Sequence, residues 1–211
     1  MIVPQILLEK TDRAIFIGRI PRILEEGWRY LAAYFTNEDQ YFTFLENISK
    51  DKFEDFLYTI YFYYVHDLYR ITGDKAIVNI DGFMYQITLS IIEHLNNDKT
   101  KSVERIKDFI KYFSSNDIST LNEAIMVQPL NGVSIRLEFW EILYDMRNGF
   151  IHDAHWFNLI DQDSGAFASL SLIKHRNKDG TYTEYLGDIR IKFQEYLRLF
   201  WGAYLKYFGK N

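Results

Sequence analysis

Arg147, Asn148 and His152 stand close together in the stretch EILYDMRNGFIHDAHW, which covers residues 141–156. An arginine fork can hold two phosphate oxygens and stabilise the negative charge that develops when a phosphodiester is attacked. A histidine titrates at a pH of about 6.5 and can move a proton near neutral pH. Asn148 lies one helical turn before His152, where an amide can bond an imidazole or a phosphate oxygen. These residue types suit proton transfer at a bound phosphate group.

The element that must position these residues is a helix predicted over Ser134–Phe150, because its apolar residues recur at helical spacing. Arg147 continues the same apolar row, where an unpaired guanidinium is costly. Glu141 and Asp145, one turn apart, could form a pair of carboxylates, but local salt bridges are expected instead, and either acid could orient Arg147. On an unbroken helix, residues 147 and 152 would point about 140° apart. We therefore expect Gly149 to end or loosen the helix, so that His152 can turn back towards Arg147.

A plainer interpretation is an ordinary helix C-terminus, where cations favour the helix dipole and glycine commonly stops the helix. Against it stands a resemblance. Arg147-Asn148-Gly-Phe-Ile-His152 is similar to the signature of the HEPN superfamily, an arginine and a polar residue followed by a histidine, near the end of a late helix. The motif covers residues 147–152, and the helical setting extends the likeness loosely over residues 20–208.

The resemblance implies a homodimer in which two such motifs face each other and cut RNA without a metal or another cofactor. Arg147 and His152 would be the catalytic pair and Asn148 their polar helper. The role implied is that of a toxin or an anti-phage defence effector, with an antitoxin or another regulatory partner. Many toxins of this type carry a tyrosine two positions after the histidine. Here that position is Ala154, so regulation through that tyrosine is not expected.

Composition favours one helical domain over residues 1–211, since 48% of the residues are hydrophobic and only 3 are proline. The formal net charge of -5 argues against a protein that coats nucleic acid through bulk charge, so RNA contacts must be local. The absence of cysteine excludes disulfides and thiolate sites and fits a cytoplasmic protein. No signal peptide or membrane span is expected.

The predicted fold is all-α, a bundle of about five to seven helices with one β-hairpin inserted over residues 167–186 before the last helix. Thr36 and Ser49 are expected to cap two of the helices. The turn of the hairpin is NKDG at residues 177–180. The helices are expected at Ile20–Phe35, after Thr36, at Ser49–Gly73, Lys75–Leu95, Ser102–Phe113, Ser119–Val127, Ser134–Phe150 and Ile189–Phe208.

Lys174, Arg176 and Lys178 form the densest basic cluster, at the predicted tip of the hairpin, and could hold RNA phosphates. A solvated turn is the alternative for this cluster, as a solvated loop is for His155, the other candidate RNA contact. Glu93 and His94 are expected on a solvated helix face, and His66 is expected to be a hydrogen-bonded core residue rather than a metal ligand. The alternative for the whole chain is a non-catalytic helical module that binds a partner protein or a nucleotide.

Overall fold

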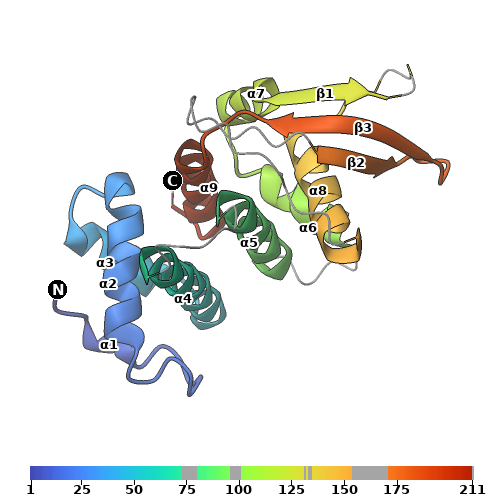
Figure 1. The fold of residues 1–211 in the computed structure, drawn as a ribbon. Coiled ribbons are helices and arrows are strands. Elements are labelled where there is room, and N and C mark those ends of the chain that lie inside the picture. The colour runs from blue at the N-terminus through green and yellow to red at the C-terminus, as the bar shows by residue number, and fades with distance from the viewer. Residues whose placement is uncertain (73–79, 96–100, 131, 133–134, 154–170, 211) are drawn as a thin grey trace. The chain divides into compact units, whose positions relative to one another are not determined.

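A computed structural model describes the chain except residues 73–79, 96–100, 131, 133–134, 154–170 and 211 (Figure 1). Side chains are described for the same residues apart from 64–72, 80–84, 86, 149–153, 171, 188 and 193. Most of the described chain is helical, and a small antiparallel sheet completes it. The prediction of a mainly helical fold is therefore correct. The prediction of one isolated hairpin is wrong, because a third strand pairs with the hairpin to form a sheet.

The described residues form nine α-helices, more than the predicted range, and one short 3-10 helix: α1 (Gln5–Leu8), α2 (Ile20–Leu31), η1 (Ala32–Tyr34), α3 (Glu38–Asn47), α4 (Lys50–Thr72), α5 (Ile80–Leu95), α6 (Ser102–Ile110), α7 (Ser115–Glu123), α8 (Phe139–Asp153) and α9 (Phe193–Tyr207). The strands are β1 (Ile125–Pro129), β2 (Ser171–Arg176) and β3 (Tyr182–Ile189). Asn37, and not Thr36, caps α3, because its side chain accepts a hydrogen bond from the Gln40 amide at 3.0 Å.

The described contacts divide the chain into two compact units, one made of Met1–Ala76 with Tyr204–Asn211 and the other of Ile77–Ala203. The prediction of a single domain stays a prediction. The first unit has an aromatic core, in which the Phe56 ring lies 6.4 Å from that of Tyr41 and 5.9 Å from that of Tyr204. Each of these rings is fully buried, which stabilises the unit by roughly 2 kcal/mol per ring.

The sheet of the second unit has the order β1-β3-β2, with both neighbouring pairs antiparallel (Figure 1). The predicted hairpin is confirmed from Ser171 onwards, and its earlier residues lie outside the described part of the chain. Its turn closes through a hydrogen bond from the Asn177 amide to the Thr181 carbonyl at 2.8 Å. Gly180 adopts a φ of 85°, which an L side chain rarely adopts and glycine adopts freely.

β1 corrects the prediction of a helix over Ser119–Val127. A capping box between Ser114 and Asp117 starts α7 earlier than predicted, and this helix ends at Glu123. The following residues are then free to pair with β3, from Ile125 opposite Ile189 to Pro129 opposite Tyr185. The strand is stabilised by a partner far away in the sequence, which local periodicity cannot reveal.

α8 lies between the sheet and α5, since it packs against β2 on one side and α5 on another. Gly187 of β3 lies where the helix meets the sheet. A Cβ atom there would lie 2.5 Å from the end of the Ile173 side chain and 3.1 Å from the Tyr185 ring, so these side chains would have to shift, while Ile142 of α8 would be in ordinary contact at 3.7 Å. The sheet thereby presents alternate residues of β2 and β3 to the helix that carries Arg147.

Candidate functional site

α8 is the element that carries the predicted catalytic residues. The Asn122 side chain accepts a hydrogen bond from the Phe139 amide at 2.9 Å, and Glu141 accepts one from the Glu138 amide at 2.9 Å, so the first turn of the helix is well capped. The helix then runs without a break to Asp153. The prediction that Gly149 ends it is wrong, because packing on both sides outweighs a helix penalty of about 1 kcal/mol for glycine.

The unbroken helix changes which positions lie near one another. Residues 147 and 152 are about 140° apart around the axis, while residues 148 and 152 are only about 40° apart. The side chain of His152 and the whole of His155 lie outside the described residues. The structure therefore shows a contact between Arg147 and Asn148. For His152 it gives only the backbone position on the helix.

Arg147 is held by an acid from another helix. Its Nη2 donates to Glu93 Oε2 at 3.0 Å, and its Nη1 donates to Asn148 Oδ1 at 3.4 Å. The Arg147 side chain is 22% exposed and that of Glu93 is 11% exposed. Arg147 Nε and Glu93 Oε1 are buried and have no hydrogen-bond partner among the described residues.

This ion pair corrects two predictions. Glu93 does not lie on a solvated face, since it is buried and turned towards α8. Neither Glu141 nor Asp145 orients Arg147. Glu141 accepts a bond from a backbone amide in the first turn of α8, and Asp145 faces the sheet, so a carboxylate on α5 takes the orienting role instead.

Asp145 forms a second polar cluster with two residues of the hairpin. His175 Nδ1 lies 2.8 Å from Asp145 Oδ2, and the Tyr185 hydroxyl donates to the same oxygen at 3.2 Å. Burial raises the pKa of Asp145 from its ordinary value of 3.8 to about 6, although the bonds from His175 and Tyr185 act in the opposite direction. Burial beside Asp145 also raises the pKa of Tyr185, which therefore stays a neutral hydrogen-bond donor.

His175 is not among the site residues predicted from the sequence. A signal was present. Ile173 and His175 are two residues apart on a predicted strand, so a histidine follows an apolar residue on the inward face. The side chain of His175 is 22% exposed, so its ring reaches from the buried carboxylate towards solvent.

The predicted RNA-binding cations of the hairpin lie on the other face of the sheet or at its turn. Lys174 and Arg176 alternate with His175 along β2 and are exposed, and Lys178 is exposed in the turn. Lys174 lies 3.6 Å from Glu184 of the neighbouring strand. Surface pairs of this kind are weak, so Lys174 remains accessible to a phosphate.

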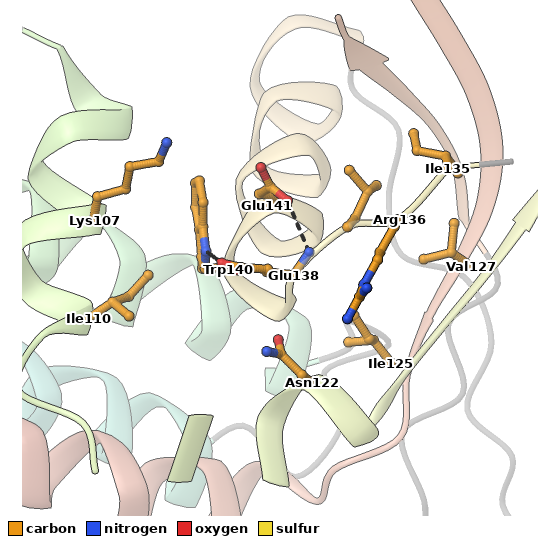
Figure 2. A pocket seen from close by; sticks show the side chains of 11 residues that line it. Lys107, Ile110, Asn122, Ile125, Val127, Ile135, Arg136, Glu138, Trp140 and Glu141 are labelled. Carbon is orange, nitrogen blue, oxygen red and sulfur yellow. Dashed lines mark hydrogen bonds between the residues drawn. The ribbon is translucent and has the colours of Figure 1, made fainter. Parts of the chain in front are cut away.

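A cleft opens beside the start of α8, with a volume of about 720 Å³. Figure 2 shows Lys107 and Ile110 on one side of it and Arg136 and Ile125 on the other, with Trp140 between them. The Lys107 ammonium lies 5.1 Å from the centre of the Trp140 ring. This cleft was not predicted from the sequence, because its lining comes from α6, α7, β1, the segment before α8 and the first turn of α8, which lie far apart along the chain.

Comparison of the chain with protein-family models, with curated proteins and with solved structures finds no match. Within the part of the chain that the structure describes, no three His, Asp or Glu side chains lie close enough together to hold a metal ion. Among the same residues, no helix has the length and apolar character needed to cross a membrane.

Proposed function

We propose that this chain is a metal-independent endoribonuclease of the HEPN type, acting in the cytoplasm as a toxin or an anti-phage defence effector. Arg147 would bind the scissile phosphate, His152 would move a proton and Asn148 would help to orient them. A homodimer would bring two such segments together around one RNA, and an antitoxin or another partner would regulate it.

The observation that carries this proposal is the contact between Arg147 and Asn148. Glu93 and Asn148 hold the guanidinium in one orientation, and it stays 22% exposed. Each terminal nitrogen carries two hydrogens, and the described bonds use one hydrogen of each, so both can also donate to a phosphate. Asn148 lies one turn before position 152 and accepts a hydrogen bond from the guanidinium, so its amide stands between Arg147 and the helix row of the histidine.

The reaction needs little besides these groups. A base removes the proton of an RNA 2′-hydroxyl, and the 2′-oxygen forms a bond to phosphorus. The bond from phosphorus to the 5′-oxygen breaks, and that oxygen leaves with a proton from an acid. The products are a 2′,3′-cyclic phosphate and a 5′-hydroxyl. Arg147 would stabilise the additional negative charge on the phosphorane.

The test is cleavage of labelled RNA by the purified full chain in EDTA, with analysis of the product ends. The proposal expects cleavage that survives chelation, leaves 2′,3′-cyclic phosphate and 5′-hydroxyl ends, and is lost in His152→Gln. Arg147→Lys is the preferred arginine variant, because it keeps a cation near Glu93 and lacks the fork. Lys111→Gln, an exposed change on the turn after α6, serves as the control. Cleavage that needs a divalent metal, or that ignores both substitutions, would refute the proposal.

The second candidate is a non-catalytic module that binds a nucleotide or a partner protein. The cleft beside α8 favours the nucleotide, because its volume suits a small ligand and its lining holds an aromatic ring, two cations and two carboxylates. A base would stack on Trp140, and Arg136 would meet a phosphate. Calorimetry with nucleotides should then show binding that Trp140→Leu and Arg136→Gln weaken, in a protein that leaves RNA intact.

A further inference from the structure

β1 forms one edge of the sheet, because the strand order is β1-β3-β2. Its ladder with β3 begins with a hydrogen bond from the Arg190 amide to the Ala124 carbonyl at 2.7 Å. Backbone groups alternate between the two sides of an antiparallel strand, so every second residue counted from Ala124 bonds to β3. The N–H and C=O groups of Ile125 and Val127 therefore point away from β3, towards the open edge.

These outward backbone groups have no partner strand. Among the residues that the structure describes, none forms a backbone hydrogen bond with Ile125 or Val127 on this side. Pro129 stands at the next outward position, where its missing N–H does not weaken the ladder with β3. Edge strands are usually protected by charged side chains, by bulges or by a covering segment. β1 reads IMVQP and has no charged side chain, so only its short length and its final proline limit pairing with another chain.

The cleft of about 720 Å³ lies on the side of this edge that faces α8. Val127 stands opposite Gly187, which lies where α8 meets the sheet, and Ile125 points to the same face two positions earlier. Both side chains line the cleft together with Trp140 of α8 (Figure 2). A strand added beside β1 would place every second side chain on this face, over the cleft.

The charges around the cleft favour an acidic occupant. Lys107 and Arg136 lie on opposite sides of it (Figure 2), and neither forms an ion pair with another described residue. The two carboxylates of the lining already accept hydrogen bonds within the protein. Glu141 accepts one from the Glu138 amide at 2.9 Å, and the Glu138 carboxylate accepts one from the Trp140 indole. The two cations are therefore the charges left to pair with a ligand.

We infer that the outer edge of β1 and the adjoining cleft bind an extended, acidic segment of a partner protein, which adds a strand to the sheet. Backbone hydrogen bonds to Ile125 and Val127 would hold the segment. Its side chains on the α8 face would enter the cleft, where an apolar group meets Trp140 and a carboxylate meets Lys107 or Arg136. A nucleotide in the same cleft would use the ring and the cations but leave the edge unpaired, so the open edge favours a peptide. This binding does not require RNA cleavage.

The first experiment selects ligands from random heptapeptides displayed on phage, with the purified full chain as the target. We expect the enriched peptides to carry apolar residues at every second position and at least one acidic residue. A selected peptide is then synthesised with capped ends, and its affinity is measured by fluorescence polarisation. Alternate amides of an added strand face β1, so N-methylation of that set should weaken binding by about tenfold or more. N-methylation of the intervening amides should change the affinity by less than about threefold.

The second experiment changes the protein. Val127→Pro removes an outward N–H and keeps the bonds to β3, so the peptide should bind about tenfold more weakly. Arg136→Gln should weaken the acidic peptide more than its analogue with glutamine in place of the acid. Gln128→Thr is the matched control, because this exposed side chain of β1 points to the opposite face of the sheet. Circular dichroism verifies that each variant is folded.

The inference fails if no peptide is enriched, or if the two sets of methylated peptides bind equally well. It also fails if AMP binds in the cleft and no peptide does, since the edge then has no role. The methylated peptides keep the test decisive should Val127→Pro not fold, because they leave the protein unchanged. RNA cleavage is measured in a separate assay, so the failure of one proposal is distinguishable from the failure of the other.

Discussion

Replacing Arg147 should destabilise the fold, apart from any effect on activity, because its ion pair with Glu93 joins α8 to α5. Arg147→Ala leaves the Glu93 side chain, which is 11% exposed and whose Oε1 has no described partner, without its cation. Breaking a buried pair costs about 3–5 kcal/mol, against about 0–1 kcal/mol for an exposed one. Because Arg147 keeps 22% exposure, we take the lower end, about 3 kcal/mol.

A loss of this size should lower the melting temperature by about 6–12 °C in a chain of this length. Urea unfolding followed by circular dichroism measures the free energy directly. Glu93→Met in the Arg147→Ala background removes the unpaired carboxylate, so the double variant should lie within about 1 kcal/mol of the wild-type protein. The coupling energy between the two changes would then be about 2 kcal/mol or more. An Arg147→Ala variant as stable as the wild type, or additive effects of the two substitutions, would refute this reasoning.

Three further predictions concern other parts of the molecule. Burial raises the pKa of Asp145 from 3.8 to about 6, so its ionisation costs the fold stability increasingly between about pH 4 and pH 6, and the cost is constant above that range. Asp145→Asn should therefore gain about 2 kcal/mol relative to the wild type between pH 4 and pH 7, and a difference independent of pH in urea unfolding would contradict this. Gly27→Ala places a Cβ atom 2.4 Å from the hydroxyl of the buried Tyr41 and should lower the free energy of unfolding, measured by calorimetry, by about 1–3 kcal/mol. An unchanged stability would contradict this and would show that the ring can move aside. Ser114→Ala removes the capping box of α7 and should lower the free energy of unfolding by about 1 kcal/mol. An unchanged melting temperature would contradict this and would show that water can replace the cap.

The elements that local sequence specifies were predicted well. The turn residues of NKDG give the hairpin, because Gly180 takes the positive φ and Asp179 accepts a bond from the Thr181 amide at 3.0 Å. The helical spacing of apolar residues likewise gives α4 and α9 close to their observed ranges. Such signals depend on residues close together in the sequence, so they can be recognised without knowledge of the fold.

The features that depend on distant partners were missed. β1 exists because Ile125 pairs with Ile189, and α8 continues through Gly149 because it is packed on two sides. The same limit applies to the candidate site. Arg147 and Asn148 are neighbours on one helix and could be predicted together. Glu93 lies 54 positions from Arg147, and His175 lies 30 positions from Asp145, so only the fold brings them together.

The most direct test of the central claim is the cleavage rate of His152→Gln relative to the wild-type protein under single-turnover conditions in EDTA. Both proteins should be compared at equal folded fractions, verified by circular dichroism. We predict that the wild-type protein cuts RNA to 2′,3′-cyclic phosphate ends and that His152→Gln is slower by about 100-fold or more. Equal rates for the two proteins, or intact RNA after incubation with the wild type, would contradict the claim.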